Sequence, residues 1–124
     1  MEKQPVVLVV DDEAFNVDYL FQELEDFGVS TISAENGIEA LKQVAAHAPD
    51  LVLLDIMMPF LSGWEVLKQL RENALTKDVP VALLTARASP RDDNQQHPTN
   101  YCDYITKPFE PEDLLRRVRQ ILAG

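Results

Sequence analysis

The chain has 124 residues, of which 46% are hydrophobic and 26% charged, and this composition is typical of a single globular domain with one core. Its formal net charge of −10 disfavours binding of this chain alone to the anionic backbone of nucleic acid. No apolar stretch approaches the roughly 18 residues of a membrane span, the N-terminus lacks a signal-peptide pattern, and the single cysteine excludes an internal disulfide, so we expect a cytoplasmic protein.

Strand and helix patterns alternate along the first half of the chain. The β-branched run Val6–Val10 predicts a buried strand, and the helical pattern after it ends at Gly28, a typical C-cap residue. The apolar stripe of this helix is Val17, Leu20, Leu24 and Phe27. Residues 29–34 are more polar and predict a strand at an edge of the sheet. Asn36 then favours the start of a second helix, which ends near Pro49.

The second half repeats the alternation. Short apolar runs predict strands over residues 51–54, 79–84 and 101–105, and residues 59–63 read as a loop. A third helix carries Trp64, Leu67 and Leu70. The last helix begins at Pro111, where a first-turn proline is favoured. Its stripe consists of Leu114, Leu115, Val118, Ile121 and Leu122.

Residues 89–100 form a polar stretch at the place where the fourth strand–helix unit has its helix, and the helical pattern there is weak. Ser89 and Pro90 are good start signals, yet the segment has no apolar stripe that would hold a helix against the sheet, and Pro98 disfavours helical geometry at the residue before it. We therefore expect at most about two helical turns, or an irregular segment that is more mobile than the other helices. A normal helix held by polar contacts is the alternative.

Five strand–helix units predict one α/β domain over residues 1–124, with a doubly wound parallel sheet and helices on both faces. In such folds, ligands bind beyond the carboxyl ends of the strands, where the strand order reverses. The residues at those ends are Asp11, Asp12, Glu13, Asp55, Thr85, Ala86 and Lys107. A parallel sheet would bring them to one crevice.

Carboxylates gathered in this way repel each other, and a divalent cation would remove the conflict. Oxygen ligands without cysteine or histidine favour Mg²⁺ over zinc. A carboxylate beside Mg²⁺ and a lysine can attack phosphorus and form an aspartyl phosphate. Each residue alone also has a purely structural interpretation: acidic residues start helices, and Asp55, Thr85 or Lys107 can simply end strands or lie in loops. The joint placement is what favours a site.

The segments "VVDDE", "LLDIMMP" with Gly63 beyond it, "LLTA" and "DYITKPF" together resemble the receiver domain of bacterial two-component response regulators, over the whole chain. The resemblance implies a five-stranded sheet in the order 2-1-3-4-5, as in flavodoxin-like and CheY-like folds. It implies a signalling module that accepts a phosphoryl group from a histidine kinase or a histidine phosphotransfer protein. The cofactor implied is Mg²⁺.

The resemblance also implies a role for each matching residue. Asp55 resembles the phosphoacceptor, and Lys107 resembles the phosphate-binding lysine. Asp12 and Asp55 resemble direct Mg²⁺ ligands, with Asp11 acting through water and the Met57 carbonyl as a main-chain ligand. Thr85 and Tyr104 resemble the switch pair, and Pro108 is a candidate for a cis peptide bond.

The stretch "HPTNYCDY" departs from the family, which usually has a run of small residues there.

Beyond its own phosphorylation and dephosphorylation, we expect no enzyme activity. A nucleophilic-aspartate phosphatase would need a second aspartate at the position of Met57. An electron carrier with a flavin would need a loop rich in serine, threonine and glycine after the first strand, where this chain has the acidic stretch "DDEAFN". A receiver-like scaffold that is never phosphorylated is the remaining alternative. Because the chain stops just after its last helix, we expect a single-domain regulator or a receiver taken from a larger protein.

Overall fold

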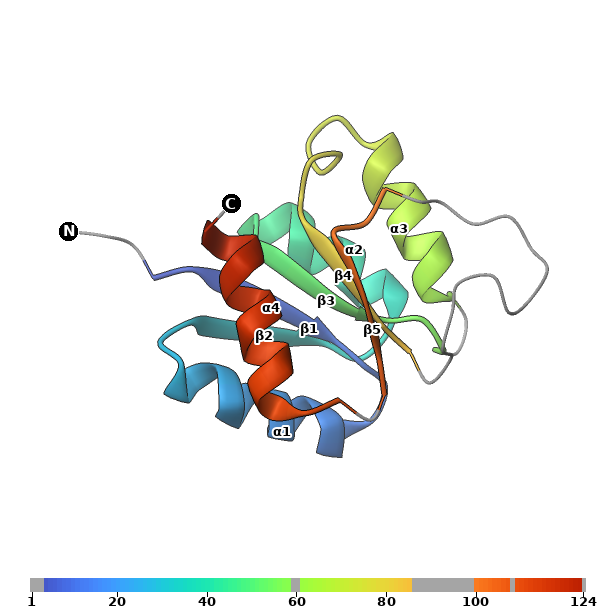
Figure 1. Ribbon diagram of the computed structural model, residues 1–124. Coiled ribbons are helices and arrows are strands. Elements are labelled where there is room, and N and C mark those ends of the chain that lie inside the picture. The colour runs from blue at the N-terminus through green and yellow to red at the C-terminus, as the bar shows by residue number, and fades with distance from the viewer. Residues whose placement is uncertain (1–3, 59–60, 86–99, 108, 124) are drawn as a thin grey trace.

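A computed structural model describes residues 4–58, 61–85, 100–107 and 109–123. The architecture is a parallel β-sheet between two layers of helices (Figure 1). The strands are β1 (Val6–Val10), β2 (Ser30–Ala34), β3 (Leu51–Asp55), β4 (Val81–Thr85) and β5 (Asp103–Thr106). The helices are α1 (Ala14–Asp26), α2 (Gly37–His47), α3 (Gly63–Glu72) and α4 (Pro111–Ala123). The helix labelled α4 is therefore the C-terminal helix of the sequence analysis.

All strand pairs are parallel, and the order is β2-β1-β3-β4-β5. This order confirms the predicted topology, including the edge position of the polar strand β2. The chain passes from β1 outward to β2 and from β3 outward to β4, so the order reverses between β1 and β3. Loops that leave these two central strands diverge to opposite sides, which leaves room for a site at their carboxyl ends.

Each face of the sheet has its own apolar core. One cluster joins the sheet to α2 and α3, and the other joins it to α1 and α4, as the layers in Figure 1 show. The three strands with near-continuous apolar runs, β1, β3 and β4, are buried along almost their whole length. Burial on both faces is what such runs predict, and it gives the residues at the strand ends a rigid support.

Two predicted helix boundaries are confirmed in detail. The helix α1 ends where expected, because Gly28 has a positive φ of 95°, a conformation that glycine adopts without steric cost. The helix α2 begins after Asn36, whose side-chain oxygen accepts a hydrogen bond of 2.8 Å from the backbone N–H of Glu39.

Several strand boundaries differ from the prediction by one or two residues. The strand β3 includes Asp55, so this carboxylate ends the strand and does not merely follow it. The strands β4 and β5 begin about two residues later than expected, at Val81 and Asp103. The reason lies in Arg71, which donates hydrogen bonds to carbonyls of the chain before each strand. The acceptors are the carbonyls of Lys77, Val79 and Asn100.

The helix expected within residues 89–100 falls mainly in the segment 86–99, which lies outside the described residues, and so does Pro108.

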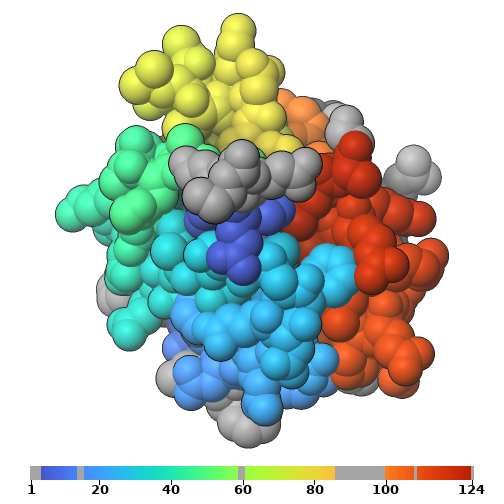
Figure 2. Space-filling view, turned by 90° about the vertical axis from the view of Figure 1, so that its left-hand side faces the viewer, coloured from blue at the N-terminus to red at the C-terminus, as the bar shows by residue number. Residues whose placement is uncertain are grey.

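Figure 2 views the molecule from the edge where the strands begin, with α1 and α4 next to each other. At this edge the Asp50 carboxylate accepts a hydrogen bond of 2.8 Å from the Val6 N–H and joins two strand starts. Among the helices that the structure describes, none is long and apolar enough to cross a bilayer.

Candidate functional site

Asp55 is the last residue of β3, and its position is set from both sides. In the sheet it pairs with Leu84 of β4, and its residue as a whole is 5% exposed. Its Oδ1 atom accepts a hydrogen bond of 3.2 Å from the Met57 N–H, whereas Oδ2 lies 3.7 Å from the ammonium nitrogen of Lys107. One oxygen is therefore held by the main chain, and the other faces a cation.

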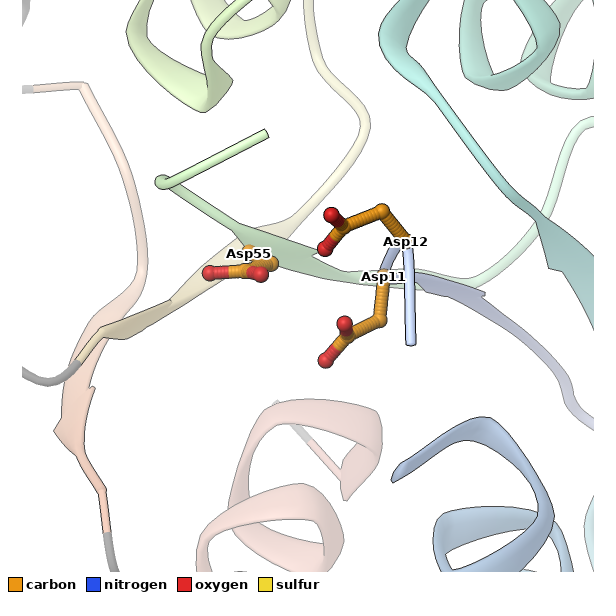
Figure 3. A group of neighbouring side chains, drawn as sticks. All are labelled: Asp11, Asp12 and Asp55. Atoms are coloured by element: carbon orange, nitrogen blue, oxygen red, sulfur yellow. The ribbon is translucent and has the colours of Figure 1, made fainter. Parts of the chain in front are cut away.

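Asp11 and Asp12 follow β1, the neighbouring strand. The Asp11 N–H donates to the Ala34 carbonyl at 3.2 Å, which extends the pairing with β2 by one residue and aims the Asp11 carboxylate at the sheet edge. This carboxylate is fully buried, and its Oδ1 atom accepts a hydrogen bond of 3.0 Å from the Glu13 N–H. Asp12 is exposed at the mouth of the site. Figure 3 shows the three carboxylates gathered where β1 and β3 end.

Lys107 reaches this cluster from the far side of β4. It follows β5, and its N–H donates to the Thr85 carbonyl at 2.6 Å, so the backbone of β4 fixes where the side chain starts. The ammonium nitrogen lies 3.2 Å from Asp11 Oδ2 and 3.7 Å from Asp55 Oδ2. Because both carboxylates are buried, this ammonium is screened less by solvent than a surface lysine would be.

Burial raises the pKa of Asp55 from its ordinary value of 3.8 to about 6. The Lys107 ammonium opposes this rise, the neighbouring charges of Asp11 and Asp12 add to it, and the hydrogen bond from Met57 lowers it. The site thus holds three acidic groups against one ammonium among its described residues, which is an arrangement that a further cation would stabilise.

The donor set fits a hard divalent cation. Asp11, Asp12 and Asp55 each offer one carboxylate oxygen, and these oxygens all lie within 4.8 Å of one another. Bonds of about 2.1 Å to Mg²⁺ place opposite ligands about 4.2 Å apart, so small side-chain adjustments or a bridging water would complete such a sphere. Neither histidine nor cysteine belongs to this group, as expected for magnesium rather than zinc.

The other predicted residues take different positions. Thr85 ends β4, is fully buried and lies one residue beyond the partner of Asp55, so it borders the site. Met57 lies two residues after β3, and its side chain is exposed. Its main-chain N–H donates to Asp55 Oδ1, so the Met57 main chain lies close to the carboxylates. Tyr104 does not join the cluster. Its ring packs on the α3 face of the sheet against Trp64 and Tyr101, with centroid distances of 6.5 and 6.1 Å.

One residue that contacts the acid cluster, Asn16, and one that packs beside Tyr104, Trp64, were not predicted as site residues. Asn16, in the first turn of α1, donates a hydrogen bond of 3.3 Å to Asp11 Oδ2. Trp64 begins the aromatic group around Tyr104, although its sequence position indicated only a core residue of a helix. For Asn16 the sequence offered one signal: asparagine is a weak helix former, so an asparagine inside a predicted helix suggests that its side chain makes a specific contact.

Comparison with known proteins agrees with this geometry. The sequence profile of the response regulator receiver domain matches residues 7–119, which is most of the chain. The chain belongs to the response regulator receiver domain family. Receiver domains are signalling domains of two-component systems, and the acid cluster of this chain lies at the sheet edge where the parallel strands led us to expect it.

Individual relatives support the assignment. The chain is 40% identical over 116 residues to the phosphate regulon transcriptional regulatory protein PhoB of Klebsiella pneumoniae, which covers 94% of this chain and 51% of that protein. It is 43% identical to the alkaline phosphatase synthesis transcriptional regulatory protein PhoP of Bacillus subtilis, over 94% of this chain and 48% of that protein. The chain thus spans about half the length of these relatives.

A solved structure matches the receiver fold along its full length. The crystal structure of a putative response regulator from Chloroflexus aurantiacus superposes with a TM-score of 0.89 at 34% identity. The match covers 98% of this receiver domain and 100% of that chain.

Proposed function

We propose that this receiver domain takes a phosphoryl group onto Asp55 from a phosphohistidine of a histidine kinase or a histidine phosphotransfer protein. The observation that carries the proposal is the setting of Asp55 Oδ2, which faces the Lys107 ammonium beside two further carboxylates. In this step a carboxylate oxygen of Asp55 forms a bond to phosphorus. The phosphorus–nitrogen bond of the donor breaks, and the released imidazole keeps the electron pair and takes up a proton from solvent.

The residues around Asp55 suit this step. The N–H of Met57 holds one carboxylate oxygen, so the other is presented to the donor in a defined direction. Lys107 supplies a positive charge for the phosphoryl oxygens, and the buried Thr85 offers a hydroxyl at the same sheet edge. Because burial raises the pKa of Asp55 to about 6, most of this group is ionised, and thus nucleophilic, at neutral pH.

We propose Mg²⁺ as the cofactor of this chemistry, held by Asp12 and Asp55, by Asp11 through water, and by the Met57 carbonyl. When bound, the ion would neutralise the charge that develops on the phosphoryl oxygens. Its effect on the protein itself is to relieve the repulsion among three carboxylates whose oxygens lie within 4.8 Å.

The signal would leave the site through Thr85 and Tyr104. Thr85 stands between the site and β5, since its carbonyl accepts the Lys107 N–H and it pairs with Thr106. Tyr104 lies two residues before Thr106 on the same strand. A movement of Thr85 toward a phosphoryl group would therefore change the surroundings of Tyr104 and shift the balance between two conformations.

The partner or output domain that reads this change is a further part of the proposal, since the chain spans about half of its relatives. We propose that the receiver domain turns over no substrate beyond its own phosphorylation and dephosphorylation. A scaffold that is never phosphorylated would not require an ammonium placed between two buried carboxylates, so the position of Lys107 argues against this alternative.

The test is incubation with acetyl phosphate and Mg²⁺, followed by intact mass measurement. The wild type should gain the mass of one phosphoryl group, and Asp55→Asn should gain none. Asp50→Asn is the matched control, because Asp50 lies just before the other end of the same strand and is exposed. Equal labelling of wild type and Asp55→Asn would show that the phosphoacceptor is another residue.

A further inference from the structure

The side chain of Asn16 is committed to the acid cluster. Its Nδ2 atom donates to Asp11 Oδ2 at 3.3 Å, and the Asp11 side chain is completely buried. Helix capping does not account for this asparagine, because the N-cap of α1 is Glu13 and Asn16 lies inside the first turn. Asparagine also lowers helix stability relative to most residues, so its contribution here lies in the contact with Asp11.

Two donors share one oxygen of Asp11. The Lys107 ammonium approaches Oδ2 to 3.2 Å, and the Asn16 amide approaches the same atom to 3.3 Å, whereas Oδ1 is held by the Glu13 N–H. Lys107 is divided between two carboxylates, because Asp55 Oδ2 lies only 3.7 Å from its nitrogen. The amide of Asn16, by contrast, donates to Asp11 alone among the described residues of the cluster.

A phosphoryl group on Asp55 would change this balance. It carries more negative charge than a carboxylate and offers three acceptor oxygens, so it attracts an ammonium more strongly than Asp11 does. When Lys107 turns toward it, Asp11 Oδ2 loses one of its two donors. A buried carboxylate that loses its partners is costly and tends to change its orientation.

We propose that Asn16 is a positioning residue of the receiver site: its amide keeps the Asp11 carboxylate aimed at the cation site and releases Lys107 for the phosphoryl group. The inference rests on the function proposed above. A neutral donor suits this task, because a second cation beside Asp11 would compete with the divalent ion, whereas an amide orients the carboxylate without cancelling its charge. Removal of a group that orients a metal ligand in this way typically weakens metal affinity about 10–100-fold.

The first test measures Mg²⁺ affinity and needs no phosphorylation. Asn16→Leu has nearly the same size and no donor, Asn16→Gln keeps the amide, and Gln22→Ala is a control at an exposed position of the same helix. The dissociation constant for Mg²⁺ follows from the melting temperature against MgCl₂ concentration. We expect about tenfold weaker binding for Asn16→Leu and values near wild type for the other two variants.

A merely structural role for Asn16 would lower the melting temperature without Mg²⁺ and leave the dissociation constant unchanged, and that result would overturn the proposal. Should Asn16→Leu fail to fold, Asn16→Ala carries the same expectation and cannot clash with its neighbours. A control variant that loses Mg²⁺ affinity as much as Asn16→Leu would also overturn it, because the effect would then belong to the helix.

The second test asks whether Asn16 and Lys107 share Asp11. In a double-mutant cycle of Asn16→Leu and Lys107→Ala, the loss of Mg²⁺ affinity caused by Asn16→Leu should be larger in the Lys107→Ala background, where Asp11 Oδ2 has no other donor. Additive effects would refute the shared oxygen. Wild-type protein that acetyl phosphate does not label would refute the proposed function instead, whereas normal labelling with an unchanged Mg²⁺ affinity of Asn16→Leu would refute only the role of Asn16.

Discussion

Gly63, the first residue of α3, packs directly on the backbone of Asp55. A Cβ atom at Gly63 would lie 2.6 Å from the Asp55 carbonyl oxygen and 2.7 Å from the Ile56 Cα, which are distances that real Cβ atoms do not show. The N–H of Gly63 also donates to the Ile56 carbonyl at 2.9 Å. The start of α3 is thus pressed against the strand end that carries the proposed phosphoacceptor.

Gly63→Ala should therefore damage both stability and the site. The neighbouring atoms belong to the backbone and cannot turn aside, so we expect a loss of about 1–3 kcal/mol in the free energy of unfolding. Because the strand end must shift, labelling of the folded protein by acetyl phosphate should also slow. Urea unfolding and intact mass measure the two effects. Gly28→Ala is the control, since its positive φ costs stability far from the site and should leave labelling unchanged.

Lys107→Ala should separate metal binding from phosphorylation. An ammonium pairs with phosphate oxygens but does not ligate Mg²⁺, so the dissociation constant for Mg²⁺ should stay near the wild-type value or fall. The rate of labelling should decrease by about 10²-fold, as is common when a charge-stabilising group is removed. Lys68→Ala, at an exposed position of α3, should label normally. A Lys107→Ala protein that labels at the wild-type rate would show that this lysine only closes a loop.

Mg²⁺ should stabilise the folded receiver domain, because the oxygens of Asp11, Asp12 and Asp55 come within 4.8 Å only in the folded chain. Mass action predicts about 2.7 kcal/mol at a hundred times the dissociation constant. Asp12→Asn should remove most of this gain, whereas Asp26→Asn, an exposed acid at the other end of α1, should keep it. A melting temperature that does not respond to millimolar Mg²⁺ would contradict the assigned site.

Without a divalent cation, Asp55 should make stability depend on pH. Its pKa is about 6 in the folded protein against 3.8 ordinarily, with burial as the main cause, so the folded state binds more protons between these values. The contribution of Asp55 to the free energy of unfolding is therefore greatest below about pH 4, and it is lost as the pH rises through about 6.

Asp55→Asn should in consequence raise the free energy of unfolding at pH 7.5 in EDTA. The shift corresponds to at most about 3 kcal/mol, and solvent at the mouth of the site reduces the expected gain to about 1–2 kcal/mol. The gain should fade toward pH 4. Denaturant unfolding at several pH values measures it, and a gain that is constant with pH would show that the titration of Asp55 is not its source.

Much of the fold follows from local patterns. The β-branched and apolar runs of β1, β3 and β4 predict strands buried on both faces, and the stripes of α1 and α4 predict the helices that cover one face. Gly28 and Asn36 mark helix ends through backbone chemistry that involves only a few neighbouring residues. These features are readable because their causes lie within one turn or one strand.

The gathering of Asp11, Asp12, Asp55 and Lys107 was also predictable, because parallel strands bring their carboxyl ends to one edge. Strand boundaries near Val81 and Asp103 were not, since they depend on Arg71, whose guanidinium binds carbonyls of two loops that are distant in sequence. A side chain that contacts several loops leaves no periodic signal in any one of them.

Only the tertiary structure decided how the cluster shares its charges. Lys107 pairs with Asp11 across 96 positions of sequence, and it lies closer to Asp11 than to Asp55. The place of Asn16 beside Asp11 depends on the angle at which α1 leaves β1. Sequence determined which chemical groups reach the site, because strand ends dictate that, whereas distances of a few tenths of an ångström follow from packing contributed by the whole chain.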